Sequence, residues 1–325
     1  MREVELKMLE RATALLESGE VQRVVGWKKG DFCHDPSPAV FESVDELKDF
    51  VYDWFCGANL SKYLIQIAKK EGKTAVFLKP CDTYSFNQLV KEHRIAREKV
   101  HVIAVECLGK LDIEKIKAKG VSFVQGVEVN GKDVKVLSLD GEQTLSKPEI
   151  VLSKCETCNK THQAKDEEII IHERPERDVN RFAEVEKLEK MTEDERFAFW
   201  KAQLSKCIRC NACRNVCPAC SCVKCVFDNP QSGVAAKAND DSFEEQLFHI
   251  IRAFHVAGRC TDCGECSRVC PQNIPLHLLN RKYIQDIDNL YGEYQAGETT
   301  DGKTPLTSYT EGDVEPKDVF NGGTK

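Results

Sequence analysis

The chain has 325 residues, of which 41% are hydrophobic and 30% are charged, and its formal net charge is −7. This length allows two domains, and the acidic balance gives no basic face of the kind that nucleic acid requires. No apolar stretch is long enough to span a bilayer and no signal peptide opens the chain, so we expect a cytoplasmic protein.

The first elements are predicted by hydrophobic spacing and capping signals. Apolar residues recur at helical spacing over residues 2–18, and residues 21–27 alternate as in a strand. Ser43-Val-Asp-Glu46 is a capping box that predicts a helix through about residue 55. A further helix is expected over residues 60–70.

Strands and helices then alternate. The mostly apolar runs 74–78 and 100–105 each predict a buried strand, separated by a helix from Asp82 to about residue 93. A short helix is expected over 112–119, and residues 127–136 predict a hairpin that turns at Asn130-Gly131. This alternation favours a largely parallel sheet, so we expect residues 1–164 to form an α/β domain.

The second half of the chain reads as helical. The heavily charged residues 165–196 are expected to form a linker, and residues 197–295 a domain of helices. Helices are predicted over 193–204, from the capping box Ser242-Phe-Glu-Glu245 to Gly258, and over 276–291. The glycine-rich residues 296–325 are expected to form an extended tail.

Eight of the seventeen cysteines form a repeated motif. The run C-x2-C-x2-C-x3-C-P occurs twice, 53 residues apart. This spacing is typical of two [4Fe–4S] clusters, in which the fourth cysteine of each run ligates the other cluster. Zinc, the alternative, favours separated C-x2-C pairs. We therefore assign one cluster to Cys207, Cys210, Cys213 and Cys270, and the other to Cys260, Cys263, Cys266 and Cys217.

Four more cysteines are candidates for a third centre. Cys81 and Cys107 each follow a predicted strand, at the sheet edge where ligands bind in α/β folds. Cys155-Glu-Thr-Cys158 adds two thiols. These four thiols are enough for a third metal centre, but the residues alone leave open a cluster, zinc or plain buried thiols.

Five cysteines remain. Cys220, Cys222 and Cys225 lie within six residues of one another, which favours a further iron–sulfur or zinc centre, with Cys33 or Cys56 as its fourth ligand. The alternative is that some of them are thiols packed beside the clusters.

Two resemblances follow from these motifs. The first 160 residues resemble the beta subunits of coenzyme F(420)-reducing hydrogenases and F(420)-dependent formate dehydrogenases. The matching segments are Val76-Phe-Leu-Lys-Pro-Cys81, Val102-Ile-Ala-Val-Glu-Cys107 and Cys155-Glu-Thr-Cys158, which hold one [4Fe–4S] cluster in that family. Residues 197–295 resemble the helical dicluster ferredoxin domains of heterodisulfide reductase and fumarate reductase.

The first resemblance also implies FAD and hydride exchange with coenzyme F(420). Relatives carry paired glycines near the start, whereas this chain has only Gly19 there, so we do not expect flavin. We interpret the chain as an iron–sulfur electron-transfer subunit of a cytoplasmic anaerobic oxidoreductase complex, with no catalytic residues of its own. The resemblances imply flavin, hydrogenase, formate dehydrogenase or heterodisulfide-reductase-like partner subunits. The alternatives are a flavin-containing F(420) or NAD(P)H dehydrogenase and a zinc-bearing structural scaffold.

Overall fold

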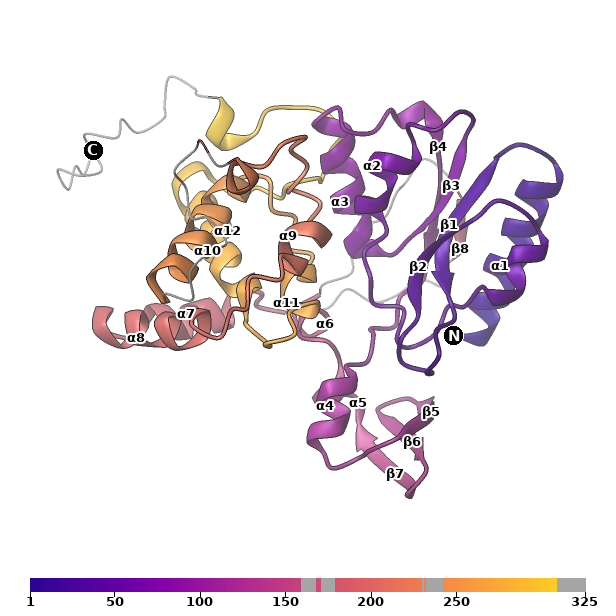
Figure 1. Ribbon diagram of the computed structural model, residues 1–325, viewed down its shortest axis with the longest axis horizontal. Coiled ribbons are helices and arrows are strands. Elements are labelled where there is room, and N and C mark those ends of the chain that lie inside the picture. The colour runs from indigo at the N-terminus through magenta and orange to yellow at the C-terminus, as the bar shows by residue number, and fades with distance from the viewer. Residues whose placement is uncertain (159–167, 171–178, 230, 232–241, 309–325) are drawn as a thin grey trace.

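The computed structural model describes residues 1–158, 168–170, 179–229, 231 and 242–308. Figure 1 shows a sheet with helices at one end of the molecule, a group of helices at the other, and a small sheet that projects below them. The large sheet has the order β2-β1-β3-β4-β8. Its strands are β1 (Arg23–Lys28), β2 (Ser37–Phe41), β3 (Thr74–Leu78), β4 (Val100–Val105) and β8 (Glu168–Ile170).

The large sheet is mostly parallel. Only β1 and β2 pair in antiparallel fashion, and the three other pairs are parallel. Every residue of β3 and β4 is buried, as expected for central strands covered on both faces. Helix α1 (Arg2–Glu17) lies on one side of the sheet, and α2 (Leu64–Ile67) and α3 (Pro80–Lys91) lie on the other (Figure 1). The prediction of mixed helices and strands with a largely parallel sheet is confirmed.

The helix predicted over residues 43–55 is wrong in length. Only Asp45–Asp49 is helical, as a 3-10 turn. The backbone then turns to pair with the end of β1, where Val51 N donates to Trp27 O at 3.0 Å. This pairing buries Phe50, and such tertiary burial outweighs a local helical preference. The helix expected over 60–70 is likewise reduced to a 3-10 turn (Ser61–Tyr63) and α2.

The small sheet is antiparallel, with the order β5-β6-β7. It contains β5 (Val124–Asn130), β6 (Asp133–Ser138) and β7 (Gly141–Ser146), with α4 (Ile113–Ala118) and α5 (Lys147–Ile150) beside it. The predicted hairpin is present, and Gly131 takes a φ of 60° in its turn. Strand β7 was not predicted, because Leu145 is its only buried residue and no alternating pattern marks it.

The C-terminal part consists of helices and 3-10 turns. The helices are α7 (Ala183–Glu189), α8 (Glu193–Leu204), α9 (Ala212–Val216), α10 (Ser242–Val256), α11 (Glu265–Arg268) and α12 (Leu276–Tyr291), and α6 (Ser153–Glu156) lies next to α11. The 3-10 turns of this part include Val226–Asp228 and Pro305–Thr307. A further 3-10 turn, Arg97–Lys99, precedes β4 in the large sheet. Helix α10 packs against both α8 and α12. The predicted bounds of α8 and α12 agree with the structure.

The charged stretch 165–196 contains ordered elements. Residues 168–170 form β8 at the edge of the large sheet. Helix α7 packs Val185 and Leu188 against Leu278 of α12. Strand β8 therefore belongs to the large sheet and α7 packs with the C-terminal helices. Residues 165–167 and 171–178 lie outside the described residues.

The first part of the expected tail also packs on the protein. Ala296 is buried, and Gly297 lies so close to Tyr84 that an added Cβ would be 1.8 Å from the Tyr84 carbonyl oxygen. Residues 309–325 lie outside the described part of the chain. None of the described helices has the length and apolar character needed to cross a membrane.

Candidate metal centres

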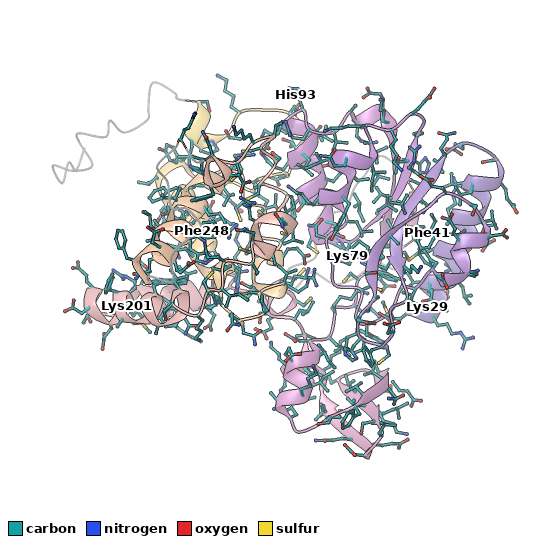
Figure 2. All side chains as sticks on the ribbon, in the orientation of Figure 1. Lys29, Phe41, Lys79, His93, Lys201 and Phe248 are labelled. Carbon is teal, nitrogen blue, oxygen red and sulfur yellow. The ribbon has the colours of Figure 1, made fainter. Side chains whose placement is uncertain are left out.

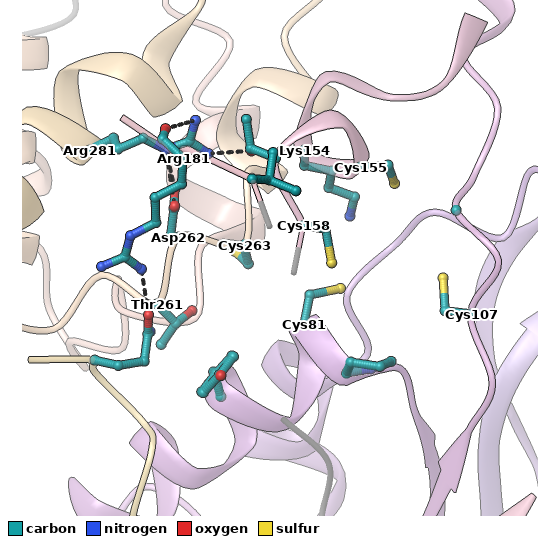
Figure 3. A pocket seen from close by; sticks show the side chains of 16 residues that line it. Cys81, Cys107, Lys154, Cys155, Cys158, Arg181, Thr261, Asp262, Cys263 and Arg281 are labelled. Carbon is teal, nitrogen blue, oxygen red and sulfur yellow. Dashed lines mark hydrogen bonds and ion pairs between the residues drawn. The ribbon is translucent and has the colours of Figure 1, made fainter. Parts of the chain in front are cut away.

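Four cysteines of the α/β domain line one cavity at the carboxyl edge of the large sheet (Figure 3). Cys81 lies in the first turn of α3, directly after β3, and Cys107 follows the end of β4. Cys155 lies in α6, and Cys158 follows two residues after that helix ends. Figure 3 shows the sulfurs of Cys81 and Cys158 pointing toward one another. The structure therefore brings together the four thiols that the sequence indicated.

The opposite wall of this cavity comes from the helical domain. It includes Thr261, Asp262, Cys263 and Arg281. The hydroxyl groups of Ser85 and Thr261 lie 2.9 Å apart across the boundary, and Arg281 bridges Asp262 at 3.0 Å and Thr157 at 3.2 Å. Cys263, one of the eight cysteines of the repeated motif, thus lies on the same cavity as the four α/β-domain thiols.

The two repeated runs have the same backbone shape. Arg209 and Asp262, at equivalent positions, have φ values of 53° and 56°, and Asn211 and Gly264 have 61° and 67°. Left-handed backbone costs a non-glycine residue about 1–2 kcal/mol, so its recurrence indicates a functional constraint. Successive N–H groups in such turns form a concave anion-binding nest. In the first run, Arg209 N donates to Cys207 Sγ at 3.4 Å.

Cysteines of the two runs lie close to one another. Burial raises the pKa of Cys213, and the neighbouring thiols of Cys270 and Cys210 raise it further. Burial likewise raises the pKa of Cys260, together with Asp262 and Cys217. Cys270 thus lies near a cysteine of the first run and Cys217 near a cysteine of the second, as the exchanged ligation expected from the sequence requires.

The donor set of each proposed group is four thiolates, which suits a [4Fe–4S] cluster because each thiolate binds a different iron. Zn–S bonds of about 2.3 Å in a tetrahedron put two sulfurs about 3.8 Å apart. Among the described residues, the only three potential ligand atoms within 4.8 Å of one another belong to Cys207, Glu245 and His249. No three cysteine sulfurs in the part of the chain that the structure describes lie within 4.8 Å of one another.

A buried guanidinium lies between the two groups of dicluster thiols. Arg252 of α10 is 2% exposed, and its Nε and Nη1 have no hydrogen-bond partner among the described residues. Burial alone would lower the pKa of Arg252, but the sulfurs of Cys266, Cys217 and Cys213 raise it. Its charge therefore acts on thiolates from both runs.

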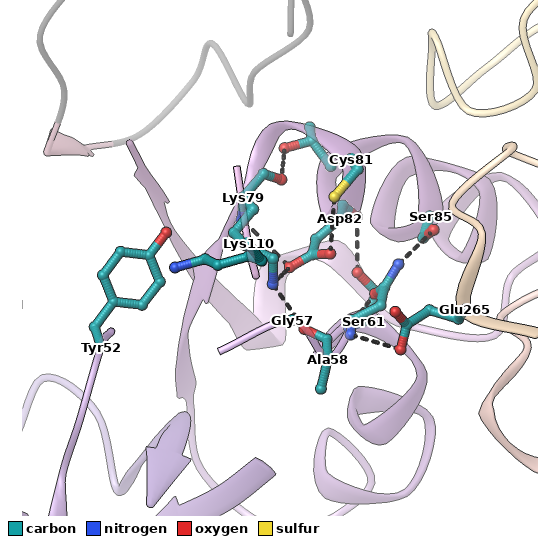
Figure 4. Close-up of polar contacts among 12 residues, drawn as sticks. Tyr52, Gly57, Ala58, Ser61, Lys79, Cys81, Asp82, Ser85, Lys110 and Glu265 are labelled. Carbon is teal, nitrogen blue, oxygen red and sulfur yellow. Dashed lines mark hydrogen bonds and ion pairs between the residues drawn. The ribbon is translucent and has the colours of Figure 1, made fainter. Parts of the chain in front are cut away.

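Two buried lysines lie near the α/β-domain thiols (Figure 4). Lys79 donates to the Asp82 carboxylate and to the Ala58 carbonyl, both at 2.7 Å. Lys110 lies 3.8 Å from the centre of the Tyr52 ring. Burial lowers the pKa of Lys110, and Cys107 opposes that effect. These cations are suited to offset the negative charge of thiolates bound to iron.

The remaining cysteines fall into separate places. Cys220, Cys222 and Cys225 line a second cavity, beside α10. The thiol of Cys33 contacts Val124 O at 3.5 Å, and that of Cys56 contacts Asp53 Oδ1 at 3.4 Å. Neither Cys33 nor Cys56 is among the described residues that line the second cavity, so the structure does not bring the expected fourth ligand there.

Sequence reasoning missed a polar face on α10. Glu245, His249 and Arg252 are all buried, and the first two lie against Cys207. Burial lowers the pKa of His249 to about 3, so this imidazole is neutral at physiological pH. The spacing i, i+4, i+7 places all three on one side of the helix. Polar residues at that spacing, in a helix that follows a cysteine run, were the available signal.

Comparison with known proteins agrees with this geometry. Residues 203–274 match the family model of the 4Fe-4S dicluster domain. The beta subunit of F(420)-dependent formate dehydrogenase from Methanocaldococcus jannaschii is 23% identical over 337 residues, which cover 85% of this chain and 88% of that protein. The chain is similar to this beta subunit along most of its length, and it contains a segment that matches the 4Fe-4S dicluster domain. Both resemblances stated from the sequence are confirmed.

Three further proteins match parts of the chain. The beta subunit of F(420)-dependent formate dehydrogenase 1 from Methanococcus maripaludis is 25% identical over 275 residues, which cover 66% of the present chain and 71% of that protein. A putative ferredoxin-3 from Sinorhizobium fredii is 37% identical over 75 residues, which cover 22% of the chain and 70% of the ferredoxin. A chain of the F(420)-reducing [NiFe] hydrogenase complex from Methanosarcina barkeri aligns with a TM-score of 0.37 and 15% identity, covering 48% of this chain and 63% of that one.

Proposed function

We propose that this protein is the iron–sulfur electron-transfer subunit of an anaerobic oxidoreductase complex. In this proposal it holds three [4Fe–4S] clusters. One is bound by Cys81, Cys107, Cys155 and Cys158, and two are bound by the eight cysteines of the repeated runs with Cys217 and Cys270 exchanged. The dicluster domain and the formate dehydrogenase relatives support the role of an electron-transfer subunit.

The main support for this proposal is the cavity that the α/β-domain cysteines share with Cys263. Cys263 of the second run and the four α/β-domain cysteines line the same space, so the chain holds two ligand sets side by side. A [4Fe–4S] cluster, when bound, supplies a carrier for one electron at a time. The buried lysines, Arg252 and the left-handed N–H nests offset the charge that such a carrier gains on reduction.

The first cysteine run reaches the surface of the protein, away from the shared cavity. Cys210 is exposed, and the neighbouring Ile208 is 59% exposed. Apolar exposure beside a ligand is suited to contact with another redox protein. The relatives' names favour formate dehydrogenase or hydrogenase catalytic subunits as partners there, with flavin or heterodisulfide-reductase-like subunits as the other partners that the sequence resemblances imply.

Anaerobic purification of the full chain tests the proposal. We expect at least about twelve irons with equal acid-labile sulfide per chain, reduction by a one-electron donor, and no oxidation of reduced coenzyme F(420) or NAD(P)H by the chain alone. Release of FAD on denaturation, together with oxidation of either hydride donor, would replace the proposal with the flavin-dehydrogenase alternative. A colourless zinc protein would exclude both.

A further inference from the structure

We propose that Cys220, Cys222 and Cys225 hold a fourth [4Fe–4S] cluster, in the cavity beside α10. This goes beyond the proposed function, which requires only three clusters. All three cysteines line that cavity, and they come from the loop that directly follows the first cysteine run.

The loop that carries these cysteines is held in place from both domains. Lys62 Nζ donates to the carbonyl of Cys220, and the Arg94 guanidinium donates to the carbonyl of Ser221. The Ser221 hydroxyl contacts Glu92 and Arg259, each at 3.2 Å. Ser221 is buried between two of the cysteines. Because four side chains hold this loop in place, it is a preformed binding site rather than a flexible surface segment.

The cavity is lined by an excess of positive charge. Its cationic residues are Lys62, Arg214, Arg252 and Arg259, and Asp228 is the only carboxylate among its described lining residues. Arg214 pairs with Asp228 at 2.8 Å and Arg259 with Glu92 at 2.6 Å, which leaves Lys62 and Arg252 without a carboxylate in these contacts. Because a cluster held by three thiolates is an anion, this site suits it.

The fourth iron would take His255 as its ligand. This residue of α10 lines the same cavity, and imidazole is a good ligand for iron. Cys33 and Cys56 contact other parts of the α/β domain. Three thiolates and one imidazole therefore complete the donor set from residues that the structure brings together.

The proposed centre lies between the second dicluster group and the surface. Cys220 and Cys260 both pack against a buried cluster that contains Cys217, and Cys217 and Cys260 are assigned to that group. On the outer side, Cys222 is exposed and Val223 is 91% exposed. The site therefore provides a second surface for contact with a redox partner, separate from that at Cys210.

Iron counting on the full chain tests the inference. The wild-type protein, reconstituted and purified without oxygen, is expected to contain about sixteen irons. The triple variant Cys220→Ser/Cys222→Ser/Cys225→Ser is expected to lose about four irons and to keep the EPR signals of the other clusters. The matched control Cys33→Ser/Cys56→Ser should keep the wild-type iron content.

The outcomes separate this inference from the proposed function. About twelve irons in both the wild type and the triple variant, or loss of zinc in place of iron, would overturn the fourth cluster and leave the three-cluster relay standing. Thiol alkylation tests it without any variant. In the loaded protein Cys222 should resist iodoacetamide despite its exposure, and it should react once iron is removed. Rapid alkylation of Cys222 in protein that retains all its iron would also overturn the inference.

Discussion

Lys154 and Glu265 form a buried ion pair that joins two of the cysteine-bearing loops. Lys154 directly precedes Cys155 in α6, and Glu265 directly precedes Cys266 in α11. Glu265 is fully buried and also accepts two hydrogen bonds from Arg268 at 2.8 Å and one from Asn59 N at 3.1 Å. The pair therefore fixes the α/β-domain cysteines relative to the dicluster domain.

Replacing this carboxylate is expected to destabilise the junction. Glu265→Gln leaves Lys154 buried without its counter-charge, which costs about 3–5 kcal/mol for a buried pair. The apparent melting temperature of the loaded protein should fall accordingly. Glu114→Gln is the matched control, because it removes an exposed pair with Lys117 that is worth about 0–1 kcal/mol. Equal melting temperatures for both variants would contradict a structural role for the pair.

The stability difference between the wild type and Glu265→Gln has a defined pH dependence. Burial alone would raise the pKa of Glu265, but Lys154 and Arg268 hold it far below its ordinary value. Its contribution to stability is fully present above the unfolded pKa of about 4.3 and is lost as pH falls through the folded pKa. The difference in melting temperature between wild type and Glu265→Gln should therefore stay constant between about pH 6 and pH 8. A difference that shrinks within this window would show that the carboxylate is not held ionised.

Double variants test the exchanged ligation of the two dicluster groups. Cys217→Ser/Cys260→Ser removes two ligands of one cluster, so about four irons should be lost. Cys217→Ser/Cys213→Ser removes a ligand from each of two clusters, so about eight should be lost. Ligation of each cluster by its own run would reverse the two results. Iron and sulfide analysis of anaerobically reconstituted protein distinguishes them.

Arg252 is expected to raise the reduction potentials of both dicluster centres. Arg252→Met removes a buried positive charge that faces sulfurs from both runs, so both potentials should become more negative. A shift of about 59 mV corresponds to a tenfold change in a one-electron equilibrium, and we expect at least that in EPR-monitored redox titrations. Lys206→Met is the control, because Lys206 is next to Cys207 in sequence but is exposed. A similar shift in both variants would point to a general charge effect.

The sequence predicted the parts of this molecule that local patterns determine. The runs that became β3 and β4 are continuously buried strands, and α12 has clear apolar spacing. The cysteine groups followed from spacing and from the position of Cys81 and Cys107 after two adjacent parallel strands.

Contacts between distant segments could not be predicted in this way. The pairing of Glu265 with Lys154 joins residues 111 positions apart, and no local pattern marks either partner. Strand β8 has only three residues in a charged stretch, and it forms because the edge of β4 offers unpaired backbone groups. The helix expected over 43–55 gave way to pairing with β1 for the same kind of reason.

Removal of the metal should loosen the two cysteine runs more than the rest of the chain. Arg209, Asn211 and Asp262 hold left-handed backbone that is unfavourable for residues with a Cβ, and bound metal offsets this cost. After chelation of iron, amide hydrogen exchange should accelerate over residues 207–217 and 260–270, while the buried strands β3 and β4 keep their protection. The variants Asn211→Gly and Asp262→Gly, which relieve the strain, should reduce the acceleration in their own runs. Equal acceleration in the runs and in β3 would instead indicate that the metal supports the whole fold.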